Sequence, residues 1–258
     1  MKNHEIDYKL MGEEMQCVEI ELDPQEAVIA EPGSFMMMND GIQMQTLFGD
    51  GNEKGIMGKL FSAGKRLLTG ENLFMTVYTN QVSDKRRVTF AAPYAGKIIP
   101  LNLSLLGEKI ICQKDSFLCA AKGVAVGIEF QKKLGTGLFG GEGFIMQKLE
   151  GDGMAFVHSG GHVIERDLQP GELLKVDTGC IVAFTSTINY DIQFVGGVKN
   201  TLFGGEGMFY ATLRGPGKVW IQTLPISRLA GRILSYGHGS RREEGSILGG
   251  LGNLLDGD

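Results

Sequence analysis

The sequence is poor in the residues that most often carry chemistry. Its 258 residues include 4 His, 4 Cys and 1 Trp. The cysteines show no CxxC spacing, so we expect small buried thiols in a reducing compartment. No serine lies in a Gly-x-Ser-x-Gly elbow, and the chain has neither a Walker loop nor a dinucleotide fingerprint in a strand–helix context. The sequence therefore predicts no enzyme, no catalytic residue and no cofactor.

A metal site has little support in the histidine pattern. His158 and His162 flank a Ser-Gly-Gly segment, and Glu165 follows them. No third nitrogen ligand lies near, and the His-x-His spacing of cupin-type metal sites is missing. We therefore expect no metal, and we place both histidines at the solvent-facing ends of hairpins.

Excess positive charge and long apolar runs are also missing. The formal net charge of −5 argues against a general nucleic-acid binder, because phosphate contacts need clustered Lys and Arg. The dense basic cluster Lys85-Arg86-Arg87 lies at a predicted strand start, where it is typical of a solvated edge. No apolar run approaches the roughly 18–20 residues that span a membrane. The first residues lack an apolar signal segment, so we expect a cytoplasmic protein.

Glycine, in contrast, is abundant and patterned. The chain has 39 glycines, spread between short apolar runs as in the turns of a β protein. The hexapeptide LFGGEG at 138–143 returns letter for letter at 202–207, and Thr69-Gly70-Glu71-Asn72 is a weaker copy. Each copy precedes a strand-like run, and its glycines permit the positive φ of a sharp turn. The predicted structural turn residues are Gly70, Glu71, Gly141, Glu142, Gly143, Gly205, Glu206 and Gly207.

A second motif recurs in step with the first. Glu26, Glu108 and Glu172 each precede an apolar run. The spacing from Glu108 to Glu142 equals that from Glu172 to Glu206, since 142 − 108 = 206 − 172 = 34. We infer three internal repeats, the sequence blocks at about 18–95, 96–160 and 161–225. They would form one β domain over 1–230, with a Gly/Leu tail over 231–258.

The repeated glutamates have two interpretations. A carboxylate in a glycine-rich bend can accept backbone N–H bonds and lock the turn, and that role would place the same residue in every block. Alternatively, the three carboxylates of one set converge on a cation or ligand.

Strands are predicted from alternating apolar and polar residues, and hairpins from the turns between them. Gly151-Asp152-Gly153 and Gly215-Pro216-Gly217 each stand between two apolar runs. We expect a β-hairpin at each of these turns.

Two segments depart from the strand pattern. Lys59–Leu68 has helical spacing of its apolar residues, which predicts either a short amphipathic helix packed on the sheets or a membrane-surface or partner-binding segment. The end of the chain, Gly237–Asp258, is either a frayed terminus or a segment that docks on a neighbouring subunit or a membrane.

The motifs LFGGEG with GPGKVWIQTLP, PGE with VDTGCIVAF, and KRLLTGENLF together resemble the altered-inheritance-of-mitochondria family, over roughly Val18 to Leu224. The resemblance implies a double-stranded β-helix-like, all-β fold of three β-sandwich repeats around a pseudo-threefold axis. Each repeat would be similar to a subunit of the tryptophan RNA-binding attenuation protein (TRAP-like), and the protein would be a homotrimer. The RNA contacts of that protein do not carry over, because no Lys/Arg pattern recurs in the three blocks.

The function expected from these observations is a non-enzymatic, homo-oligomeric assembly or scaffold protein. Its partners would be copies of itself, with a membrane surface or a protein partner reached through Lys59–Leu68 or the C-terminal tail, and no nucleic acid. The alternative is a small-ligand-binding module that uses clefts between repeats or subunits.

Overall fold

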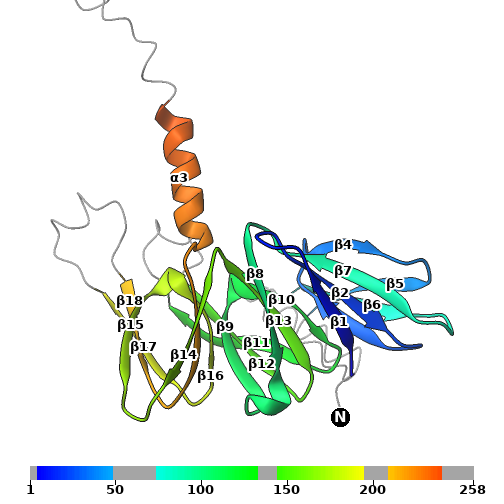
Figure 1. The fold of residues 1–258 in the computed structure, drawn as a ribbon, viewed down its shortest axis with the longest axis horizontal. Coiled ribbons are helices and arrows are strands. Elements are labelled where there is room, and N and C mark those ends of the chain that lie inside the picture. Colours follow the sequence, from blue (N-terminus) through cyan, green and yellow to red (C-terminus); the bar gives the residue numbers. More distant parts are fainter. Residues whose placement is uncertain (1–4, 49–73, 133–143, 195–208, 240–258) are drawn as a thin grey trace, which may run out of the picture.

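The structure, a computed structural model, describes residues 5–48, 74–132, 144–194 and 209–239. This part of the chain is predominantly β-sheet, which confirms the all-β prediction at that level. Its strands form four sheets, and the early and late strands of the chain lie toward opposite ends of the longest axis of the molecule (Figure 1).

Two of the sheets, A and D, are short. Sheet A has the strand order β1 (Asp7–Met11), β2 (Cys17–Leu22), β7 (Arg86–Ala91) and β4 (Phe35–Met38). Sheet D has the order β15 (Leu173–Asp177), β18 (Phe209–Arg214) and β17 (Asn189–Phe194).

The other two sheets are six-stranded, and each combines strands of two sequence blocks. Sheet B has the order β5 (Ile42–Phe48), β6 (Phe74–Asn80), β3 (Ala27–Ala30), β10 (Phe117–Ala121), β13 (Met154–Gly160) and β8 (Gly96–Asn102). Sheet C has the order β11 (Ala125–Lys132), β12 (Phe144–Glu150), β9 (Lys109–Gln113), β16 (Ile181–Thr185), β19 (Gly217–Gln222) and β14 (Val163–Leu168).

The hairpin prediction was wrong at both Gly-x-Gly turns. β12 lies in sheet C and β13 in sheet B, while β18 lies in sheet D and β19 in sheet C. The turns exist, and Gly151 and Gly217 have positive φ values of 143° and 151°. Each turn, however, carries the chain from one sheet to another. Alternation of residue types indicates a strand, but it does not say which strand is its partner.

The turns before β3, β9 and β15 share an unusual backbone conformation. Gln25, Gly107 and Gly171 all have positive φ, at 66°, 83° and 81°. The glutamate that follows each one accepts a backbone bond at its carbonyl oxygen, from Asn80, Gly151 and Gly215 respectively. Two of these glutamates also close the turn with the side chain. Glu26 accepts from the Asp23 N–H at 2.9 Å, and Glu172 accepts from the Gln169 N–H at 2.8 Å, as the turn-locking interpretation predicted.

The apolar side chains form two core clusters. The larger one spans sheets A, B and C and includes Phe90, Phe156 and Leu149. The smaller one includes Phe184, Val219 and Leu213, and Ile111 of β9 also packs into it. Three short 3-10 helices complete the described sheets: Leu103–Leu105, Lys114–Ser116 and Thr178–Cys180.

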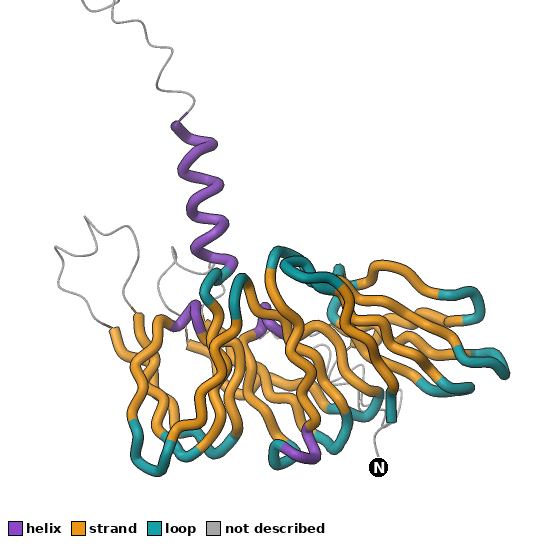
Figure 2. The backbone as a smooth tube through the Cα atoms, viewed as in Figure 1, coloured by secondary structure: helices purple, strands orange, loops and turns teal. Residues whose placement is uncertain are grey.

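A single α-helix of the described residues, α3 (Ile226–Gly239), follows β19 and projects away from the sheets (Figure 2). The sequence analysis did not predict this helix. Its base is held by Arg228, whose Nη2 lies 3.6 Å from Asp177 Oδ2. Ile233 and Tyr236 are 62% and 80% exposed. In the part of the chain that the structure describes, no helix is long and apolar enough to cross a membrane.

Candidate functional site

Two antiparallel strand pairs connect successive sequence blocks, and we call them the internal joints. In the pair β3·β10, Ala30 faces Cys119. In the pair β9·β16, Cys112 faces Ala183. Each joint merges three strands of one block with three strands of the next into a six-stranded sheet. The joints therefore hold the three sequence blocks together.

In the described part of the chain, one strand of the first block, β4, and one strand of the third block, β15, lack this partner. β4 takes the place in the first block that β10 and β16 take in the second and third, and it ends sheet A. β15 takes the place in the third block that β3 and β9 take earlier, and it ends sheet D. Among the described residues, no strand pairs with the outer edge of either one. We call these the open edges. They lie toward opposite ends of the molecule (Figure 1).

β4, β10 and β16 have the same irregularity as well as the same place. Each shows a register shift against its inner neighbour, which is typical of a β-bulge. The shifts lie between Phe35 and Met37, between Phe117 and Cys119, and between Ile181 and Ala183. The three strands are therefore built alike, and only their surroundings differ.

Burial separates β4 sharply from the other two strands. Every residue of β10 and β16 is at most 8% exposed. The four residues of β4 are Phe35, Met36, Met37 and Met38, with exposures of 39%, 54%, 47% and 36%. Four consecutive large apolar residues on an unpaired edge are a liability for a solitary chain, because edges template further strand pairing. This stretch is the strongest candidate for a functional surface in the described residues.

β15 shows a weaker form of the same contrast. All four residues of β3 are buried, whereas Leu173 of β15 is 46% exposed. Lys175 is exposed and lies over the ring of Tyr210, with its Nζ 5.1 Å from the ring centroid. Ile29 and Ile111, which stand at the corresponding places of β3 and β9, are 3% and 4% exposed.

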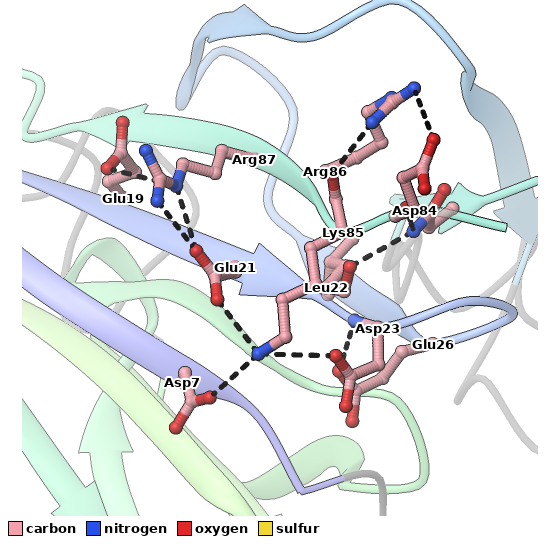
Figure 3. Close-up of polar contacts among 11 residues, drawn as sticks. Asp7, Glu19, Glu21, Leu22, Asp23, Glu26, Asp84, Lys85, Arg86 and Arg87 are labelled. Atoms are coloured by element: carbon pink, nitrogen blue, oxygen red, sulfur yellow. Dashed lines mark hydrogen bonds and ion pairs between the residues drawn. The ribbon is translucent and has the colours of Figure 1, made fainter. Parts of the chain in front are cut away.

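A charged cluster on β2 and β7 lies beside β4 (Figure 3). Arg87 Nη2 donates to Glu21 at 2.8 Å, and Lys85 Nζ donates to the same carboxylate at 2.9 Å. These two hydrogen bonds lower the pKa of Glu21, because they favour its charged form. The basic cluster does start a strand, as predicted, and its charges are paired. Next to it lies a shallow pocket of about 170 Å³, lined by Glu19, Met37, Met38, Asn39, Arg87 and Thr89.

A half-buried carboxylate lies at the end of the first internal joint. The Glu31 N–H donates to the Leu118 carbonyl oxygen at 3.1 Å, directly after β3. Burial raises the pKa of Glu31 to about 7, and the nearby charge of Asp115 adds to the shift. Lys114 opposes the shift with a smaller effect.

The prediction for His158 was wrong. This residue lies on β13, between β10 and β8 in sheet B, and is 1% exposed. Its ring packs edge to face against the ring of Tyr94, and the two ring centroids are 4.4 Å apart. Burial lowers the pKa of His158 to about 4, and a backbone interaction with Tyr94 opposes the shift with a smaller effect. In the described residues no group of three or more His, Cys, Asp or Glu side chains is placed to hold a metal ion.

The remaining predicted residues have mixed outcomes. Cys112 and Cys119 are buried as predicted, while Cys17 and Cys180 are half-buried, and none of the four forms a disulfide. The turn residues Gly70, Glu71, Gly141, Glu142, Gly143, Gly205, Glu206 and Gly207 lie outside the described residues, as do both LFGGEG copies and the segment Lys59–Leu68. β4 was not recognised from the sequence as a functional surface. Its run Phe35–Met38, apolar throughout where β2 alternates, was the available signal of an unusual surface.

Comparison with known proteins places these features in a family. A protein of Streptococcus pyogenes serotype M6, described as uncharacterized, is 30% identical over 223 residues, which cover 85% of this chain and 86% of that protein. A crystal structure of a Streptococcus pyogenes protein has the same fold, with a TM-score of 0.71 at 24% identity over 90% of this chain and 99% of that one. Residues 8–224 match the family described as mitochondrial biogenesis AIM24. The chain belongs to that family.

Proposed function

We propose that this protein is a non-enzymatic, homo-oligomeric scaffold whose three sequence blocks are copies of one six-stranded unit. The repeated joints, bulges and positive-φ turns support the repeat interpretation. The predicted pseudo-threefold axis and homotrimer stay predictions. Within one chain β4 and β15 lie toward opposite ends, so a closed arrangement of blocks would need more than this chain alone (Figure 1).

The exposure of β4 is the observation that carries the proposal. β10 and β16, which share the register shift of β4, are buried, whereas β4 is exposed. Burying apolar area stabilises by roughly 25 cal/mol per Å², so covering four large side chains favours association. Strand addition would also satisfy the backbone groups of the edge. A further copy of the chain is the partner that already carries a matching edge.

Light scattering at micromolar concentration tests the proposal. We expect a mass well above the 28.0 kDa of one chain, and a homotrimer would give 3 × 28.0 = 84.0 kDa. Met37→Lys should weaken association by about tenfold or more, because it places a charge on the edge. Met44→Lys is the matched control, since Met44 is 46% exposed on a different strand, β5. A monomeric wild-type protein, or equal losses in both variants, would contradict the proposal.

Attachment to an anionic lipid surface is a second candidate function, favoured by α3. The helix carries Arg228 and Arg232 and no acidic residue. Ile226, Leu229 and Ile233 fall on one side of it by helical spacing. An amphipathic helix with only positive charges fits the headgroup region of an anionic bilayer. A bundle of such helices from several copies is less favoured, because it would gather like charges.

Sedimentation with phosphatidylglycerol vesicles tests this second function. The wild-type chain should sediment with them and not with phosphatidylcholine vesicles. Ile233→Asp should abolish most of the binding, because it charges the apolar side. Gly231→Asp, which adds the same charge to the opposite side, should keep most of it. Absent binding by the wild type, or equal losses in the two variants, would rule this function out.

A further inference from the structure

The internal joints follow one register, which can be continued to the open edges. In the first joint Ala30 faces Cys119, and in the second Cys112 faces Ala183. The offset between corresponding residues is 82 from the first block to the second and 64 from the second to the third, since 112 − 30 = 119 − 37 = 82 and 183 − 119 = 176 − 112 = 64. Adding 64 to the number of Cys112 in β9 gives Val176 in β15, and subtracting 82 from that of Cys119 in β10 gives Met37 in β4. The next pair in the series therefore joins Val176 to Met37.

The backbone groups of the two open edges match as well. In the first joint the Glu31 N–H donates to Leu118 O at 3.1 Å, and the Lys122 N–H donates to Ala27 O at 3.0 Å. The corresponding groups on the open edges are the Asp177 N–H with Met36 O, and the Asp40 N–H with Leu173 O. The inner edge of β4 is already used, as the Asn39 N–H donates to Arg87 O at 2.9 Å. Because backbone groups of alternate residues point to opposite sides of a strand, the N–H and C=O groups of Met36 and Met38 and the N–H of Asp40 point away from β7. These are the groups that a strand such as β15 would bond.

We propose that β15 of one copy pairs antiparallel with β4 of the next copy, in the register of the internal joints. Val176 then faces Met37, Lys175 faces Met38 and Leu174 faces Asn39 of the next copy. The joint turns sheet D of one copy and sheet A of the next into a continuous sheet like sheets B and C. This inference rests on the proposed function and specifies which surfaces carry it.

The side chains show how this joint differs from the internal ones. Methionine is flexible and can fill an irregular space, so Met37 and Met38 can pack where the internal joint has Cys119 and Ala120. Lys175 takes the place of Ile29 and Ile111. Its aliphatic stem can lie along Met38 while its ammonium reaches water. The joint between copies is therefore weaker than the internal joints and is reversible on dilution.

The two edges are different surfaces, so the contact is head to tail. Such a contact leaves one free β4 and one free β15 in any linear array, and it ends only when a ring closes. The predicted homotrimer is compatible with this contact if three joints close such a ring. A two-fold dimer that pairs β4 with β4 is not compatible with it.

Disulfide cross-linking between two differently tagged chains tests the register. One chain carries Met37→Cys and the other Val176→Cys, both with Cys17→Ser and Cys180→Ser to remove the half-buried thiols. Directly facing residues have Cα atoms about 4.5–5.5 Å apart, within the range of a disulfide. We expect a mixed product at several times the yield of Met37→Cys with Leu173→Cys, which the register places three residues away. Met38→Cys with Lys175→Cys repeats the test with two exposed residues, so that folding is not at risk.

Four results would overturn the pairing. The Met37→Cys chain would cross-link to itself if β4 met β4. A single chain with both cysteines would close within a monomer if the edges met internally. Assembly seen by light scattering without the mixed product would leave the scaffold proposal standing and reject this joint. A wild-type chain that is monomeric at every concentration would reject both.

Discussion

β10 and β4 have the same bulge and the same kind of inner neighbour, yet they meet opposite environments. β10 lies between β13 and β3 and is buried along its whole length. β4 has β7 on one side, and all four of its residues are exposed. The difference lies in whether a block precedes the strand in the chain. An internal strand has its partner in the same polypeptide, and the first strand of its kind must find one elsewhere or stay open.

The strand environments also explain the choice of residues. β10 uses Cys119, Ala120 and Ala121 at the joint, whereas β4 uses Met37, Met38 and Asn39. Small side chains suit a joint that is closed once during folding and packed at interior density. Methionine suits a surface that must tolerate water and then a partner. Mutations at corresponding positions of the internal joints and the open edges test this explanation.

The largest effect should come from placing the same charge at corresponding positions. Ala120→Glu buries a carboxylate at a residue that is 0% exposed, and it should cost more than about 4 kcal/mol of unfolding free energy or prevent folding. Met38→Glu changes a residue that is 36% exposed, and for dilute protein it should cost less than about 1 kcal/mol. Denaturant unfolding followed by circular dichroism measures both. Similar costs for the two variants would mean that β4 is not a free edge in solution.

Replacing the lysine of the open edge should make that joint resemble the closed ones. Lys175→Ile restores the residue type of Ile29 and Ile111, and it should tighten association by about tenfold, equivalent to 1.4 kcal/mol. A dilution series in light scattering measures the change. Lys9→Ile on β1, another edge strand, is the control and should have little effect. Equal tightening by both variants would indicate unspecific edge association instead.

Glu31 should make the first closed joint sensitive to pH. Its pKa is raised to about 7 by burial, so folding disfavours the charged carboxylate. The contribution to stability is fully present below the ordinary pKa of 4.5 and is lost as the pH rises through about 7. Glu31→Gln should therefore raise the free energy of unfolding at pH 8 and change it little at pH 5. The same change at both pH values would show that ionisation of Glu31 plays no part.

The smallest effects should come from the three positive-φ turns. A Cβ at Gly107 or Gly171 would meet nothing within 4 Å, so only the backbone conformation opposes a side chain there. Gly107→Ala and Gly171→Ala should each lower the free energy of unfolding by about 1 kcal/mol. Gln25→Gly should raise it by less than about 1 kcal/mol, because it relieves the same conformation in the first block. A neutral Gly171→Ala would show that the turn before β15 adapts.

The sequence predicted strands and turns better than it predicted strand partners. The motif of Glu26 and Glu172 predicted turns that the structure closes with those carboxylates. The apolar alternation that located β12 and β13 could not say that they belong to different sheets, since partner choice depends on distant residues. His158 was misplaced for the same reason, because a central strand is covered on both sides. The segment of α3 was assigned largely to a tail, because its three glycines lower its helix propensity.

The candidate site could be predicted only in part. Four consecutive apolar residues at Phe35–Met38 indicate a strand that is apolar on both faces, which is usually an interior strand. Only the sheet order shows that this interior-type strand lies at an edge. The register with β15 also needed the observed pairs of the internal joints. Sequence blocks alone align strands with their copies and do not say which strands pair.

Hydrogen exchange of β4 and β15 at two protein concentrations tests the central claim most directly. The amides of Met36, Met38 and Asp40, and those of Leu173, Lys175 and Asp177, should exchange slowly in concentrated protein and quickly in dilute protein. The amides of β10 and β16 should exchange slowly at both concentrations, because their joints lie within the chain. Fast exchange of β4 and β15 at every concentration would contradict the account.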